Sequence, residues 1–339
     1  MAEPKIRLAL NGFGRIGRAI LRLVATGRAG EGFEIVAIND IANLDICAYL
    51  FKYDSVYGPF PGSVDETAGM LIINGQSIPF HQQRDISNLD LTGVDLVLEC
   101  TGAVIDVKSA RAGLDAGAGA VLISGPSGMA EATIVLGANE HLLNGQKIVS
   151  NASCTTNALG PLLKVLDDAF GVESGHMTTV HCYTGSQPTI DKPRDNFARS
   201  RAAALSMVPT TTSASHLLGE VLPALKGRIE GRAIRVPTAS VSAIDLTVQT
   251  REKVSVALVN ELLEASAAAS PLLGWITEPL VSTDLRGRPE SLIISARETS
   301  VSVGGLLRVF GWYDNEWGFS NRMLDMAHLM ATRTTTTTK

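Results

Sequence analysis

The sequence predicts an α/β protein whose two halves are built differently, and three observations carry this prediction. Up to about residue 150, short apolar runs alternate with amphipathic helical patterns, which is typical of a parallel sheet covered by helices. Beyond it, longer strand patterns follow one another with fewer helices, which indicates an α+β domain with a mixed, mainly antiparallel sheet. Between the halves, a polar stretch containing a cysteine opens a helix.

A glycine-rich turn follows the first predicted strand. The apolar run at 6–10 leads into Gly12, Gly14 and Gly17, which open a helical pattern, and the next strand ends at Asp40. Glycines at this spacing let the backbone approach a pyrophosphate at the helix N-terminus, and the acid can accept hydrogen bonds from ribose hydroxyls. The pattern predicts a Rossmann dinucleotide-binding domain, and the charge of Asp40, which disfavours a 2′-phosphate, predicts NAD over NADP. The alternative is a purely structural glycine turn.

Polar residues end two further strands of the first half. Thr101 and Ser124 each follow an apolar run, at the strand ends where an open parallel sheet binds its ligand. Asn74-Gly75 between two other runs predicts a hairpin. The runs that complete this sheet lie at 71–73, 78–80, 94–98, 120–123, 133–136 and 147–149.

A polar turn around Cys154 opens the next helix. The stretch Ser150–Asn157 precedes leucines at helical spacing, and Ser153 is expected to cap the helix, so that Cys154 lies in its first turn. The positive end of the helix dipole should lower the pKa of the thiol there and make it a nucleophile. The alternative is a small buried core residue. The polar side chains that crowd the turn favour the functional interpretation, and Pro161 is expected to kink the helix.

His181 is the expected partner of Cys154. A helix over 155–170 runs roughly 24 Å, and a strand from about Ser174 brings His181 back by roughly 23 Å. If the helix and the strand pack antiparallel, the imidazole and the thiol lie at the same height. The alternative is a histidine satisfied by its strand neighbours.

Other polar groups in the second half are suited to phosphate. Thr210–Ser213 precede a helix, so their hydroxyls could hold an anion or simply cap the helix. Arg235 lies in an apolar strand and must meet either a carboxylate or an anionic ligand. The polar segment Gly185–Arg201, which includes Arg199, is expected to lie over a site or an interface. The remaining elements are expected as strands at 176–184, 230–237, 239–249, 290–296, 299–303 and 306–313, and as helices at about 211–223, 254–268 and 319–331.

Composition excludes several classes of protein. The chain has 339 residues, a net charge of −5 and no basic block, so neither nucleic acid nor a membrane surface is an expected partner. No apolar run is long enough to span a membrane. Four cysteines without a CxxC or metal-ligand spacing indicate neither a disulfide framework nor a metal site. The N-terminus passes directly into a strand, which leaves no room for a signal peptide, and we therefore expect a reducing, cytoplasmic setting.

At these motifs the chain resembles the glyceraldehyde-3-phosphate dehydrogenase family. The resemblance implies an NAD-binding Rossmann domain at 1–153, onto which a helix at 319–333 packs back, a catalytic domain at 154–318, and a homotetramer. It rests on stretches in the family's order, namely Asn11-Gly-Phe-Gly-Arg-Ile-Gly-Arg18, Ser150-Asn-Ala-Ser-Cys-Thr-Thr-Asn157, the strand carrying His181, Arg235-Val-Pro-Thr238 and Trp312-Tyr-Asp-Asn-Glu-Trp317.

The resemblance also implies roles for individual residues. Cys154 would be the nucleophile and His181 the base. The residues expected to bind ligands are Thr184 and Arg235 for the substrate's phosphate, Ser153, Thr155, Arg199, Thr212 and Ser213 for inorganic phosphate, and Gly12, Arg15, Ile16, Asp40, Arg84, Thr101, Ser124 and Asn315 for NAD.

The implied reaction is the NAD-dependent oxidative phosphorylation of glyceraldehyde 3-phosphate to 1,3-bisphosphoglycerate through a Cys154 thioester, a step of glycolysis and gluconeogenesis. One alternative is erythrose-4-phosphate oxidation within the same family, although Thr184 favours the triose. Another is an NAD-binding regulator or RNA-binding protein without turnover, against which Cys154, His181, Arg235 and the acidic balance argue. The chain departs from the family's usual residues at Val104, Ala158, Ser186, Ser213, His216 and Phe319.

Overall fold

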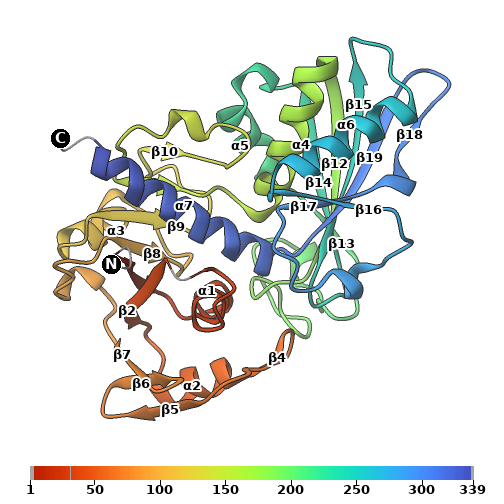
Figure 1. Ribbon diagram of the computed structural model, residues 1–339. Helices are drawn as coiled ribbons and strands as arrows, with labels where there is room; N and C mark the ends of the chain where they lie inside the picture. Colours follow the sequence, from red (N-terminus) through yellow and green to blue (C-terminus); the bar gives the residue numbers. More distant parts are fainter. Residues whose placement is uncertain (1–3, 31, 337–339) are drawn as a thin grey trace. The chain divides into compact units, whose positions relative to one another are not determined.

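The computed structural model describes residues 4–30 and 32–336, so the expectation about the N-terminus, which rests on residues 1–3, lies outside it (Figure 1). The chain forms two compact units. Of the described residues, the first unit comprises 4–30, 32–134, 141–152 and 320–336, and the second comprises 135–140 and 153–319. The predicted domain boundary between residues 153 and 154 stays a prediction, because compactness alone does not test independent folding.

The first unit is built on a nine-stranded sheet in the order β10-β11-β9-β8-β1-β2-β7-β6-β5. From β10 to β7 all neighbouring strands are parallel, and the β7–β6 and β6–β5 pairs at the other edge are antiparallel. The parallel part is the predicted Rossmann-type sheet. Its strands are β1 (Ile6–Asn11), β2 (Phe33–Asn39), β7 (Gln76–His81), β8 (Leu96–Glu99), β9 (Ala120–Ile123), β10 (Ala132–Thr133) and β11 (Ile148–Ser150), followed at the edge by β6 (Met70–Ile73) and β5 (Val64–Thr67).

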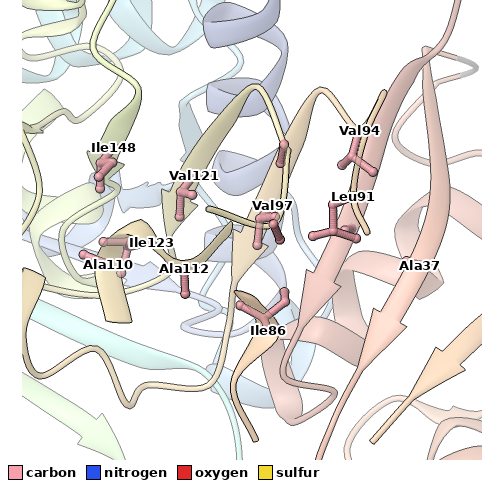
Figure 2. Packing of buried hydrophobic residues seen from close by; sticks show 13 residues of the cluster. Ala37, Ile86, Leu91, Val94, Val97, Ala110, Ala112, Val121, Ile123 and Ile148 are labelled. Carbon is pink, nitrogen blue, oxygen red and sulfur yellow. The ribbon is translucent and has the colours of Figure 1, made fainter. Parts of the chain in front are cut away.

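Small residues let a helix pack closely on this sheet. A Cβ atom at Gly113 would lie 2.9 Å from side-chain carbons of Val97 and Val121, so the helix axis can approach the strands only because that position is glycine. Figure 2 shows Ala110 and Ala112 of the same helix among the buried valines and isoleucines of the sheet. The helices of this unit are α1 (Arg15–Ala25), α2 (Leu44–Lys52), α3 (Val107–Asp115) and most of α7 (Trp317–Thr336), and β3 (Tyr53–Asp54) pairs with β4 (Gly58–Pro59) as a separate sheet.

The second unit is built on a mixed, mainly antiparallel sheet, as predicted. The strand order is β13-β14-β12-β15-β19-β17-β16, with β18 paired to β19, and only the β12–β14 and β16–β17 pairs are parallel. The strands are β12 (Val172–Cys182), β13 (Val208–Thr210), β14 (Ile229–Val236), β15 (Ser242–Thr250), β16 (Leu273–Ile276), β17 (Leu292–Ser295), β18 (Ser300–Val301) and β19 (Leu307–Tyr313), and the helices are α4 (Cys154–Phe170), α5 (Ala214–Val221) and α6 (Val256–Ala269) (Figure 1).

Several boundaries differ from the sequence expectation for identifiable reasons. The strand expected at 133–136 stops at Thr133, because the N–H of Val135 donates to the side chain of Asn139 instead of a neighbouring strand. The helix expected at 211–223 is shorter, because residues 208–210 pair with β14 and a proline at 223 has no N–H to continue the helix. Helices α2 and α3 were not predicted, since the buried face of α3 consists of alanine and glycine rather than large apolar residues.

Candidate active site

Cys154 is the first residue of α4, and Ser153 caps this helix as predicted. The Oγ atom of Ser153 accepts a hydrogen bond from the N–H of Thr156 at 3.1 Å. Because this cap occupies one N–H group of the first turn, the others are directed at the space beside the thiol. The Cys154 side chain therefore lies at the positive end of a helix of 17 residues.

His181 lies beside Cys154, as the lengths of the helix and the strand predicted. Gly171, with φ of 66°, reverses the chain after α4, and β12 then returns as far as Cys182. This return places His181 Nε2 at 3.6 Å from Cys154 Sγ, within hydrogen-bond reach for sulfur. Nδ1 contacts strand neighbours, as the alternative expected, whereas Nε2 contacts the thiol at the start of the helix.

Nδ1 of His181 contacts both the carbonyl oxygen of Cys182 and the guanidinium of Arg235. This oxygen lies 2.7 Å from His181 Nδ1 and 3.0 Å from Arg235 Nη1, which can only donate. Arg235 Nη1 also lies 2.7 Å from Nδ1, so Nδ1 either accepts from Arg235 or donates to this oxygen, and only the second arrangement leaves the lone pair of Nε2 toward the thiol. Burial, together with the charge of Arg235 next to the ring, lowers the pKa of His181 to about 4. The imidazole is consequently neutral near pH 7 and able to accept a proton.

The pKa of Cys154 moves in the direction opposite to the sequence expectation. Burial raises the pKa of the thiol, because the enclosed site withholds the water that would solvate a thiolate. The charge of Arg235 and hydrogen bonds at Thr155 lower the pKa, but burial is the larger effect. The expected lowering of the thiol pKa is therefore wrong. Ionisation of Cys154 requires transfer of its proton to a base, and Nε2 of His181 is in reach.

Tyr313 ties the helix of the thiol to the strand of the imidazole. Its hydroxyl lies 2.9 Å from Oγ1 of Thr155, the residue after Cys154, and 2.8 Å from Oγ1 of Thr179, two residues before His181. Its ring also meets the imidazole edge to face, with centroids 6.0 Å apart. Tyr313 belongs to β19, far along the chain from both threonines, so no local sequence pattern indicates this role.

A cavity of about 290 Å³ opens beside the pair of Cys154 and His181. Its lining combines hydroxyl groups with two guanidinium groups, a chemistry suited to phosphate. Arg199 is held there by Thr210, whose Oγ1 accepts from Nε at 2.7 Å. The lining residues are Ser153, Cys154, Thr155, Thr179, His181, Arg199, Thr211, Thr212, Ser213, Ala233 and Arg235.

A second cavity, of about 680 Å³, belongs to the first unit and lies at the carboxyl ends of its parallel strands. Gly12 contributes to it with φ of 95°, and a Cβ atom there would lie 2.7 Å from the backbone of Cys100 and Thr101. Gly14 caps α1 without a side chain that could cover the N–H groups of the first turn. Asp40 holds the same turn, since its Oδ2 accepts from the N–H of Phe13 at 2.7 Å. A bare helix N-terminus, a close backbone approach and an adjacent carboxylate fit a dinucleotide.

Comparison with known proteins agrees with the dinucleotide and phosphate chemistry that the two cavities indicate. The family model of the glyceraldehyde 3-phosphate dehydrogenase NAD binding domain matches residues 6–107, and that of the C-terminal domain of the same enzyme matches residues 153–315. The chain belongs to the glyceraldehyde-3-phosphate dehydrogenase family. It is 49% identical to the enzyme of that name from Pseudomonas aeruginosa over 96% of this chain and 98% of the relative. The corresponding enzymes of Cereibacter sphaeroides and Xanthobacter flavus are 47% and 46% identical, each over the same shares.

Most family residues expected for phosphate lie together around the cavity of Cys154. Every residue expected to bind phosphate lines this cavity, among the described residues, except Thr184. The hydroxyl of Thr184 instead lies 2.9 Å from Ser186 Oγ. Thr179 and Ala233 were not predicted, and Thr211 was expected only as part of the hydroxyl run. Thr211 belongs to the threonine run already noted, and Thr179 shares a strand face with His181 at a spacing of two, so both had a sequence signal.

The residues expected to bind NAD do not all line one cavity. Gly12, Asp40, Arg84 and Thr101 line the large cavity, whereas Arg15, Ile16 and Ser124 are not among its described lining residues. Arg15 donates to Asp54 at 2.5 Å. Asn315 belongs to the second unit, where its Oδ1 accepts from Cys182 Sγ at 3.0 Å.

The departures from the usual family residues fall in both units. Ser213 lines the phosphate-like cavity, Val104 lines the large cavity, and Ser186 contacts Thr184. His216 pairs with Glu220 on the exposed side of α5. In residues 4–30 and 32–336 no helix is long and apolar enough to cross a membrane, and the same part of the chain holds no group of three or more acidic, histidine or cysteine side chains arranged around a metal.

Proposed function

We propose that this chain oxidises glyceraldehyde 3-phosphate with NAD and couples the oxidation to addition of inorganic phosphate, forming 1,3-bisphosphoglycerate. The observation that carries the proposal is Cys154 Sγ at 3.6 Å from Nε2 of His181, at the edge of a cavity lined by hydroxyls and two arginines. The names of the relatives agree with this function and do not favour the erythrose-4-phosphate alternative.

The first chemical step uses the neutral pair. Nε2 of His181 takes the thiol proton as Sγ forms a bond to the aldehyde carbon, and the carbonyl oxygen becomes an alkoxide. The new imidazolium and the N–H groups of the first turn of α4 stabilise that oxygen. Bound NAD supplies the hydride acceptor that turns the resulting hemithioacetal into a thioester.

The second step is phosphate attack on the Cys154 thioester. We place inorganic phosphate against Thr212, Ser213 and Arg199, and the substrate's own phosphate against Arg235 and, after a local shift, Thr184. A phosphate oxygen bonds to the carbonyl carbon, the carbon–sulfur bond breaks, and the thiolate leaves. The imidazolium of His181 then returns the proton to sulfur, which restores the starting state.

The finer expectations of the family resemblance complete the proposal. We propose a homotetramer in a cytoplasmic setting, with 1–153 as the NAD-binding domain and 154–318 as the catalytic domain. The four cysteines are free, which suits a reducing compartment. Sedimentation of the purified chain would test the tetramer.

The deciding experiment follows NADH formation from glyceraldehyde 3-phosphate, with and without phosphate. We expect phosphate to be required for sustained turnover and Cys154→Ser to abolish it, while Cys47→Ser, at a buried site in α2, retains it. Faster turnover with erythrose 4-phosphate, or phosphate-independent turnover, would replace this function with the alternative. Sustained activity of Cys154→Ser would contradict the covalent route.

A further inference from the structure

A row of buried polar side chains crosses the parallel sheet beneath the large cavity. Asn11, Asn39 and Glu99 are the last residues of β1, β2 and β8, and the strand register aligns Asn11 with both of the others. All three are at most 8% exposed, and all three line the cavity. Polar groups buried in this way need hydrogen-bond partners.

The side chains of the row bond to one another from end to end. Asn39 Nδ2 donates to Asn11 Oδ1 at 2.8 Å, and Asn11 Nδ2 donates to Glu99 Oε2 at 2.5 Å. At the far end, Glu99 Oε1 accepts from the N–H of Thr101 at 2.8 Å and from the Thr101 hydroxyl. Glu99 therefore acts only as an acceptor in these contacts.

The backbone locks the direction of every bond in the row. Asn39 Oδ1 accepts from the N–H of Gln83 at 2.8 Å while its Nδ2 donates to the carbonyl of Gln83 at 2.9 Å, and backbone groups cannot exchange roles. This contact fixes the amide of Asn39, which in turn fixes that of Asn11. The N–H of Thr101 fixes the other end. Position 99 must consequently offer acceptors on both of its terminal atoms, which a carboxylate does and an amide does not.

The row lies beside residues that are expected to bind the cofactor. Asn11 precedes Gly12, Asn39 precedes Asp40, and the two ends of the row hold the backbone at Gln83, before Arg84, and at Thr101 itself. The row thus connects the loops after four strands that together form the mouth of the cavity.

We propose that the row Glu99–Asn11–Asn39 positions the NAD site, with Glu99 as a positioning residue whose acceptors on both oxygens set the geometry of these loops. The proposal rests on the assignment of this cavity to NAD under the proposed function. Burial raises the pKa of Glu99 while the bonds from Thr101 and Asn11 lower it.

The test is a pair of substitutions that reverse one bond. In Glu99→Gln, one amide hydrogen must face either Asn11 Nδ2 or the N–H of Thr101, so one buried donor loses its acceptor. In Asn11→Asp, two carboxylates face each other. In the double variant, the glutamine donates to the aspartate, the aspartate accepts from Asn39, and the net charge equals that of the original chain. Glu34→Gln, at an exposed position of β2, controls for loss of a charge.

We expect each single variant to weaken NAD binding, measured by calorimetry on the full chain, by about tenfold or more, and to lower the apparent Tm without ligand by roughly 2–8 °C. The double variant should bind within about threefold of the original chain. In turnover assays KM for NAD should rise while KM for glyceraldehyde 3-phosphate stays unchanged.

Three results would overturn the proposal: normal NAD binding by Glu99→Gln, a double variant as weak as the two singles combined, or a lowered Tm with unchanged NAD binding, which would make the row structural only. If Glu99→Gln does not fold, rescue by the double variant still decides the matter. An original chain that binds NAD but does not oxidise the triose would refute the proposed function and leave this test intact.

Discussion

Removal of the Tyr313 hydroxyl should loosen the link between nucleophile and base without disturbing the core. Tyr313→Phe keeps the buried ring and its edge-to-face contact with His181, but it removes the hydrogen bonds to Thr155 and Thr179. At about 1 kcal/mol net for each bond, the free energy of unfolding should fall by about 2 kcal/mol, and Tm by roughly 4–8 °C. Turnover should fall about tenfold as the alignment of Cys154 relaxes, with KM for NAD unchanged.

A double-mutant cycle makes this prediction specific. Thr179→Val removes the partner hydroxyl at nearly constant shape, so its cost should largely disappear once Tyr313 is phenylalanine. We expect a coupling of about 1 kcal/mol between the two positions, from denaturant unfolding of the single and double variants. A loss below about 0.5 kcal/mol for Tyr313→Phe, or strictly additive costs, would refute the inference that this hydroxyl holds the helix and the strand together.

Three further predictions test other parts of the two sites. Gly12→Ala should lower Tm and abolish NAD binding, because its Cβ atom would collide with the loop after β8. Gly14→Ala, whose Cβ atom would meet nothing within 4 Å, should leave the Tm measured without NAD unchanged, and equal Tm losses in the two variants would count against this steric explanation. The pKa of His181 is about 4 in the folded chain and about 6.5 in the unfolded chain, so the free energy of unfolding decreases as pH falls from about 6.5 to 4. Between pH 7 and pH 5, denaturant unfolding should show that the original chain loses about 2 kcal/mol more than His181→Asn, and parallel pH profiles of the two proteins would contradict the lowered pKa. Arg235→Lys should raise KM for glyceraldehyde 3-phosphate about tenfold or more, because lysine cannot form the bidentate contact of a guanidinium with phosphate. Arg232→Lys, on the exposed face of the same strand, should leave this KM unchanged, and equal effects of the two substitutions would exclude a phosphate contact of Arg235.

Local patterns were sufficient to predict the elements that depend on near neighbours in sequence. The hairpin at Asn74-Gly75 forms with φ of 51° and 81°, because these residues tolerate the left-handed region. The cap at Ser153 forms because its side-chain oxygen reaches the N–H group three residues ahead. The approach of His181 to Cys154 followed from the lengths of one helix and one strand joined by a tight turn.

Contacts between distant segments were beyond these patterns. Tyr313 reaches Thr155 from 158 residues away, and Thr101 joins Asn11 through Glu99 across a strand pairing that no local rule identifies. Thr184 follows the correct strand, but its side chain turned to Ser186 instead of the cavity. Side-chain direction in a loop depends on which partners the whole fold brings near.

The sequence by itself determined the two-part α/β architecture, the glycine turn for a dinucleotide and the pairing of one cysteine with one histidine, because each depends on periodicity, chain length or local hydrogen bonding. Only the tertiary structure decided the ionisation of that pair. The field at a helix end can be read from sequence, but the water removed around Cys154 and the guanidinium placed against His181 come from segments far along the chain, and burial outweighed the helix.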